Sequence, residues 1–113
     1  MARFDVCRGE SGYFLDVQAD VLEVLTTRIA VPLLAPGDAP LPARHLNPVF
    51  VVADQPLVMV TQFMSALFRS ELGPVVASLA HEADAITRAL DIALQGFWPQ
   101  KKRPTNRRAF NLP

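Results

Sequence analysis

The stretch that decides the fold is YFLDVQADVLEVLTTRIAVPLL, residues 13–34. Its first five residues, Tyr13–Val17, predict a short strand. Its last seven, Arg28–Leu34, are mostly apolar and β-branched, which is typical of a largely buried strand. Residues 18–25 predict a short helix, although the two threonines that follow weaken it. Pro32 has no backbone donor, so we expect it at a sheet edge, a bulge or a strand end.

Further strands are predicted on both sides of this stretch. Arg3–Cys7 alternates polar and apolar residues, and two glycines in the turn that follows favour a hairpin. Residues 35–48 contain four prolines and predict a long connection. A second hairpin then turns at Ala53–Pro56. The predicted strands, in chain order, are residues 3–7, 13–17, 28–34, 49–52, 57–60 and 62–68.

A helix is predicted after the break at Gly73-Pro74. Ser78 is its expected N-cap, Gly96 its expected end, and Pro99 forbids continuation. One apolar stripe runs along it at helical spacing. The stripe consists of Leu79, Ala83, Ile86, Leu90, Ala93 and Phe97. Strands first and one terminal helix predict an α+β domain with an antiparallel sheet.

The totals favour one cytoplasmic domain. The chain has 113 residues, half of them hydrophobic, which suffices for one core. No apolar run reaches the length of a membrane span, and the first residues do not predict a signal peptide. A single cysteine, Cys7, forms no internal disulfide and is expected in the core rather than as a nucleophile.

The zero net charge conceals an asymmetry. Residues 1–98 hold six arginines and all eleven acids, which leaves them at −5, whereas residues 99–113 hold five cations and no acid. We therefore expect a basic C-terminal extension over 98–113. It is either a solvated end or a contact for nucleic acid or an acidic partner.

Signals for catalysis are weak. His45 and His81 lie 36 residues apart without ligand spacing, and Asp16 with Asp20 is a poor carboxylate pair. No phosphate loop, metal motif or nucleophile elbow is present in the sequence. The residues therefore favour a binding protein without metal or cofactor.

Three features together resemble the CcdB family over residues 1–97. The chain opens with Phe4-Asp5-Val6, and LDVQAD is followed by VPLL at the family's spacing. Asn47-Pro48-Val49, the hairpin containing Met59 and the helix after LAHE keep the family order.

The resemblance implies a toxin of a type II toxin–antitoxin module. It implies a homodimer with a small, twisted, SH3-like antiparallel sheet or barrel and a C-terminal helix, as in Kid and MazF. Such toxins bind the A subunit of DNA gyrase and trap its cleaved-DNA complex; they are not enzymes. A CcdA-like antitoxin neutralises them, and DNA is contacted indirectly through gyrase or the antitoxin. The resemblance leaves two alternatives: a non-poisoning relative that still binds an antitoxin, and an RNA-cleaving toxin of the same fold.

The resemblance also implies a gyrase-binding surface. The family ends in tryptophan-glycine-isoleucine, and alignment without gaps from Leu79 puts these positions on Gln95, Gly96 and Phe97. Either Trp98 replaces the missing tryptophan from three residues further along, or poisoning is weakened, since an indole is a strong anchor. Asp91 stands where the family has an asparagine. The implied gyrase-binding residues are Val21, Leu22, Asp91, Leu94, Gln95, Gly96, Phe97 and Trp98.

Overall fold

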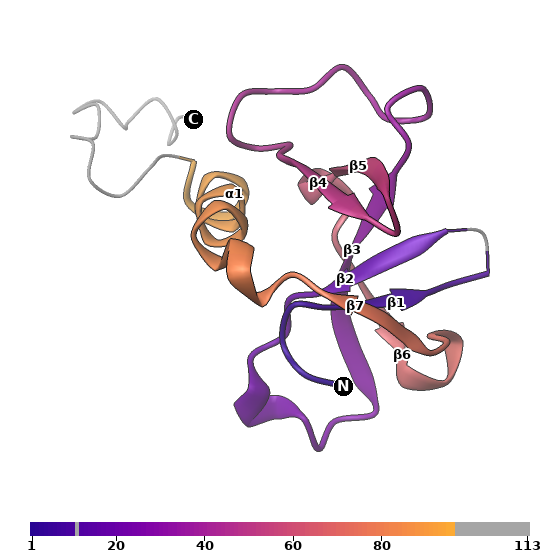
Figure 1. Cartoon of the computed structure of the whole chain (residues 1–113). Helices are drawn as coiled ribbons and strands as arrows, with labels where there is room; N and C mark the ends of the chain where they lie inside the picture. The colour runs from indigo at the N-terminus through magenta and orange to yellow at the C-terminus, as the bar shows by residue number, and fades with distance from the viewer. Residues whose placement is uncertain (11, 97–113) are drawn as a thin grey trace.

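A single curled antiparallel sheet with one helix beside it forms the molecule (Figure 1). The computed structural model describes residues 1–10 and 12–96. The strands are β1 Asp5–Arg8, β2 Tyr13–Asp16, β3 Thr27–Leu34, β4 Val49–Val52, β5 Gln55–Met59, β6 Ser65–Phe68 and β7 Val75–Ser78. The helix is α1, Ala83–Gln95, and four 3₁₀ turns are η1 Asp20–Leu22, η2 Thr61–Phe63, η3 Arg69–Glu71 and η4 Ala80–Glu82. The predicted α+β class is confirmed.

β3 is the strand on which the sheet is built. The strand order is β4-β5-β3-β2-β1-β7, and β6 also pairs with β3. β6 takes residues 27–30 of β3, whereas β5 takes residues 33–34. Pro32 therefore lies inside a central strand, so the prediction of a sheet edge, bulge or strand end was wrong. It is tolerated because it falls where β3 changes partner, and no donor is needed from it there.

The core lies between the sheet and α1. Buried apolar residues come from strands distant in the sequence and from α1, among them Val6, Leu15, Val31, Met59 and Ile86, each fully enclosed. The β4–β5 hairpin turns through Ala53 and Asp54, both with positive φ, as a tight two-residue turn requires. The predicted turn was therefore too long by two residues, since Gln55 and Pro56 already belong to β5.

The helix starts later than its sequence suggests. Ser78 is the last residue of β7 and pairs with Asp5, so it is not the helix N-cap; its hydroxyl instead accepts the backbone N–H of Ala80. Leu79 is buried, but its backbone N–H donates to the carbonyl of Phe4, which holds it in the sheet. α1 begins only at Ala83, after η4.

The apolar stripe of the helix was predicted only in part. Ile86 and Leu90 are buried as expected, but Ala93 is exposed and Ala89 is buried in its place. Gly96 ends the helix in the left-handed conformation, with φ of +78°, as predicted. The last stripe residue, Phe97, lies outside the described residues.

Two shorter elements also differ from prediction. The short helix expected over residues 18–25 is a single 3₁₀ turn, η1, and its apolar side chains do not pack against the core, since every residue from Ala19 to Leu25 is exposed. The strand expected over 62–68 is split into η2 and β6. β7 was not predicted at all.

Candidate partner-binding face

The segment between β2 and β3, residues 17–26, exposes apolar side chains at its tip. We call it the β2–β3 loop. Val21 is 83 % exposed and Val24 85 %, while Leu22 and Leu25 are 41 % and 43 % exposed. No residue of η1 is buried. Four apolar side chains grouped in eight residues of surface loop are typical of a contact surface rather than of a solvated loop.

A buried ion pair lies beneath this loop. Arg28 donates from Nε and Nη2 to one carboxylate oxygen of Asp16, at 3.0 and 2.6 Å, and both side chains are almost fully enclosed. The other carboxylate oxygen accepts the backbone N–H of Gln18 at 2.9 Å. Burial raises the pKa of the Asp16 carboxyl, and the Gln18 N–H and the Arg28 guanidinium oppose that rise. Asp16 is thus a structural partner of Arg28, not half of a carboxylate pair with Asp20.

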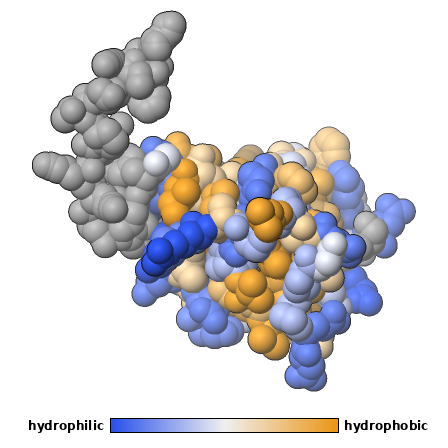
Figure 2. Space-filling view, turned by 90° about the horizontal axis from the view of Figure 1, so that it is seen from above, coloured by the Kyte–Doolittle hydropathy of each residue, from blue (hydrophilic) through white to orange (hydrophobic). Residues whose placement is uncertain are grey.

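The C-terminal end of α1 has a mixed surface, with polar side chains at Asp91 and Gln95 and an apolar one at Leu94. Gln95 donates from Nε2 to the carboxylate of Asp91 at 3.1 Å, so two of the implied site residues form a polar pair. Leu94 is 70 % exposed and borders a pocket of about 380 Å³ with Leu46 and Met64. The face seen in Figure 2 intermingles apolar and polar residues. Phe97 and Trp98 lie outside the described residues, so their predicted contacts stay predictions.

The two groups of implied site residues are not brought together within one chain. α1 packs against η2 and η4. Figure 1 shows α1 at the left, with its C-terminal end in the upper half of the picture, and the β2–β3 loop at the bottom. Val21 and Leu22 therefore occupy one end of the fold, and Asp91, Leu94 and Gln95 the other.

Sequence reasoning missed part of the apolar surface at the loop. Val24 and Leu25 border a pocket of about 500 Å³ with Phe68, which is 59 % exposed at the end of β6. The repeated valine and leucine of VLEVL was the available signal. It was assigned to a short helix, which would have buried one side of it.

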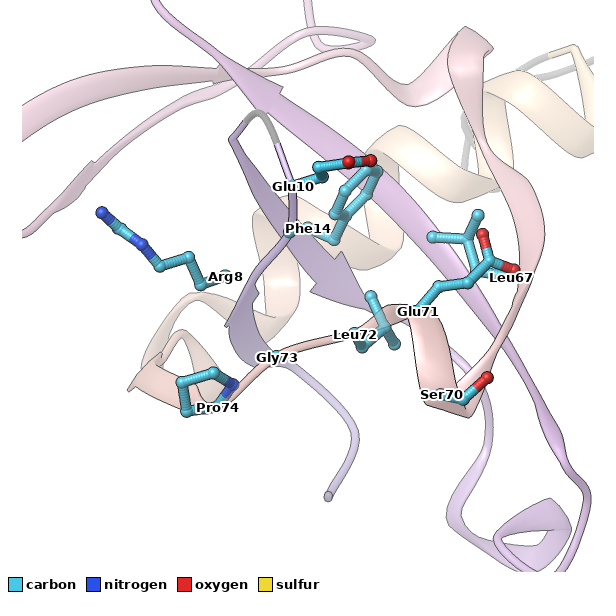
Figure 3. Close-up of a pocket in the computed structure, with 10 residues that line it drawn as sticks. Arg8, Glu10, Phe14, Leu67, Ser70, Glu71, Leu72, Gly73 and Pro74 are labelled. Atoms are coloured by element: carbon cyan, nitrogen blue, oxygen red, sulfur yellow. The ribbon is translucent and has the colours of Figure 1, made fainter.

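A larger pocket of about 590 Å³ collects the charges that RNA cleavage would need. Arg8, Glu10 and Glu71 line it around Phe14. Figure 3 shows the Arg8 side chain pointing away from both carboxylates, and Arg8 donates to the Tyr13 hydroxyl at 3.1 Å. Glu71 is engaged locally, accepting the backbone N–H of Phe68 at 3.0 Å. The three side chains do not converge on one point, as an acid, a base and a phosphate ligand would.

The other titratable candidates have local roles. Burial raises the pKa of the Cys7 thiol, and the Asp16 and Asp5 carboxylates add to the rise. The thiol is therefore a poor nucleophile. Desolvation, Arg88 and Arg44 lower the pKa of His45, and His45 Nδ1 lies 2.8 Å from Arg88 Nη1. Within residues 1–10 and 12–96, no group of three potential ligands is placed to hold a metal.

The strands, the buried Asp16–Arg28 pair and the terminal helix can now be compared with known proteins. The family model described as CcdB protein matches residues 3–96. The chain belongs to the CcdB family. It is thus a toxin of a toxin–antitoxin system, as its sequence implied. None of the helices in the described part of this CcdB-family chain is long and apolar enough to cross a membrane.

Solved structures of other toxins share the fold. An endoribonuclease in complex with its cognate antitoxin, from mycobacterial species, matches with a TM-score of 0.70 at 20 % identity, over 88 % of this chain and 99 % of that one. The Mycobacterium tuberculosis toxin MazF-mt6 matches with a TM-score of 0.68 at 15 % identity, over 80 % and 96 % of the two chains. The expected CcdB- and MazF-like fold is therefore confirmed. At these identities the likeness is one of fold.

Proposed function

We propose that this CcdB-family toxin binds the A subunit of DNA gyrase and traps the cleaved-DNA complex. It acts in the cytoplasm, without cofactor or catalysis of its own. The observation that carries the proposal is the exposed apolar tip of the β2–β3 loop, where Val21 and Leu22 occupy the positions implied for gyrase contact. Binding a partner that removes exposed apolar side chains of this kind from water lowers the free energy.

Dimerisation is part of the proposal. In one chain, the loop and the end of α1 lie at opposite ends of the fold, so a single protomer presents only half of the implied surface. A two-fold dimer allows the loop of one copy to approach the helix end of the other. The exposed apolar residues Val24, Leu25 and Phe68 offer area for such a contact. A two-fold symmetric toxin also fits a target that is itself a dimer.

The remaining parts of the proposal concern the ends and the antitoxin. Residues 1–97 form the toxin domain, and 98–113 form a basic extension in which Trp98 supplies the aromatic contact that Gln95 lacks. The extension contacts gyrase-bound DNA, and a CcdA-like antitoxin neutralises the toxin. The family match and the solved complex of a similarly folded toxin with its antitoxin support that last step.

Induction of the toxin in bacteria tests the target. The parent, Val21→Ser/Leu22→Ser and Trp98→Ala are expressed in a gyrase-sensitive strain and in one with a CcdB-resistant gyrase A subunit. We expect killing by the parent in the sensitive strain only, and none by either variant. Each apolar contact is worth about 2 kcal/mol, or about 30-fold in affinity. Val51→Ser removes an apolar side chain that is 68 % exposed on β4; it is the control and should kill like the parent.

The other outcomes identify the alternatives. Equal killing in both strains would refute gyrase as the target and point to RNA. No killing in either strain would indicate a relative that binds an antitoxin without poisoning gyrase. Full toxicity of Val21→Ser/Leu22→Ser would remove the loop from the mechanism.

A further inference from the structure

The tip of the β2–β3 loop is ordered without burying any of its own side chains. Every residue from Ala19 to Thr26 is exposed. Val21 and Val24 are more than 80 % exposed, and Leu22 and Leu25 are 41 % and 43 % exposed, so the loop gains little from the hydrophobic effect, while ordering it costs conformational entropy. Besides the backbone bonds within the loop, three polar contacts join it to the rest of the protein.

The first contact is the side chain of Gln18, which lies beneath the tip and is 2 % exposed. Its amide nitrogen Nε2 donates to the carbonyl of Leu22 at 3.0 Å. Its amide oxygen Oε1 accepts the backbone N–H of Ile29 at 3.1 Å. One side chain thus links the end of η1 to β3, and the ion pair of Asp16 and Arg28 fixes the backbone of Gln18 from below.

The second contact comes from the N-terminal segment. The backbone N–H of Arg3 donates to Asp20 Oδ1 at 2.9 Å. Asp20 is the first residue of η1, so this bond fixes the start of the turn, while Gln18 fixes its end. The segment that supplies the donor belongs to the sheet through Phe4, whose N–H donates to the carbonyl of Asp16.

The third contact comes from η3, far along the chain. Arg69 donates from Nη2 to the carbonyl of Glu23 at 2.6 Å. Its backbone N–H donates to the carbonyl of Thr26 at 2.8 Å. The descending half of the loop is thus bound to the β6–β7 connection, 46 residues later in the sequence.

We propose that Gln18, Asp20 and Arg69 are positioning residues that hold the apolar tip of the β2–β3 loop in its binding conformation before the partner arrives. They fix the tip from below, from the N-terminus and from η3. Because the loop is already ordered, binding does not have to supply the ordering entropy, and affinity rises accordingly. The identity of the partner rests on the proposed function, whereas the order of the loop is a property of the free protein.

Hydrogen exchange of the free toxin tests the order of the loop. The amides of Leu22, Glu23 and Leu25 are bonded within it. We expect their exchange to be about fivefold faster in Gln18→Met, Asp20→Ala and Arg69→Ala, the loss expected from one hydrogen bond. The buried Met59 amide reports global opening. Arg44→Ala removes an equal charge from the connection at the opposite end of the molecule and should change nothing (Figure 1).

Two results would overturn the inference. One is unchanged exchange of the loop amides, relative to Met59, in all three variants. The other is a change in Gln18→Met alone, since a defect under a buried side chain would give that result without any positioning by Asp20 and Arg69.

Binding to the gyrase A subunit tests the consequence. Arg69→Ala should weaken affinity about fivefold in the parent and not at all in Val21→Ser/Leu22→Ser, because it acts through those side chains. Equal weakening in both backgrounds would mean that Arg69 contacts the partner directly, and would overturn its positioning role. If the parent itself does not bind, the proposed function fails, and the exchange measurement still decides the inference.

Discussion

The β2–β3 loop and the C-terminal end of α1 differ in which side chains they bury and which they expose. The loop exposes valines and leucines above the buried polar groups of Asp16, Gln18 and Arg28. The end of α1 carries the polar pair of Asp91 and Gln95 and one exposed leucine, Leu94, beyond a buried apolar stripe. Polar side chains at the surface above buried apolar ones, as at the end of α1, are the usual arrangement in folded proteins. The loop leaves apolar surface in water above buried polar groups, which favours the proposal that it is the half of the face that binds a partner.

The largest expected effect is on stability and concerns the buried ion pair beneath the loop. Arg28→Met leaves the Asp16 carboxylate buried without its partner, and should lower the free energy of unfolding by about 3–5 kcal/mol. Urea denaturation measures it. The double variant Arg28→Met/Asp16→Leu removes both charges and should recover most of the loss. A double variant no more stable than the single one would show that the ion pair itself stabilises the fold.

The next effect concerns the helix end. Gln95→Trp introduces, at an exposed position, the tryptophan that the resemblance to the CcdB family implies there. Affinity for the gyrase A subunit should rise about 30-fold or more, equivalent to about 2 kcal/mol, because an indole buries a large area at small entropic cost. Gln55→Trp, exposed on β5, is the control. No gain would mean that the loop alone carries the contact or that Trp98 already fills the place.

The smallest effect is at Asp91. Asp91→Asn keeps the shape, removes one charge and gives the family's residue. Affinity should rise by a few fold at most, since single charges at partly exposed sites contribute less than about 1 kcal/mol. Titration at low and high salt measures it. Weaker binding of the variant, most evident at low salt, would show that the carboxylate pairs with a cation of the partner.

Local sequence patterns predicted the elements well where they agree with the strand pairing of the folded sheet. The strands of the quoted stretch, the β4–β5 hairpin and the end of α1 at Gly96 follow from alternation, turn residues and helix stops. β7 was not predicted because its four residues, Val75–Ser78, are too few to show a periodic pattern. They are a strand only because β1, distant in sequence, offers an edge. Pro32 was misplaced for a similar reason, since two partners share one side of β3.

The proposed site rests on the resemblance more than on any pattern in the residues. Val21 and Leu22 were placed by the family's spacing, and their exposure agrees with it. The residues beneath them were not singled out, because a buried glutamine that bonds two backbone groups looks like any other polar residue in a sequence. Only the three-dimensional contacts of Gln18 and Arg69 reveal what they do.

The buried pair of Asp16 and Arg28 also bears on how such a toxin can evolve. Changing either residue alone leaves an unpaired charge in the core. Replacing the pair by another therefore needs a double substitution or passes through an unstable single variant. The exposed positions at the end of α1 are free of that constraint and can drift one substitution at a time. A chain built this way can change its surface one residue at a time at the helix end, while the buried pair holds the base of its loop in place.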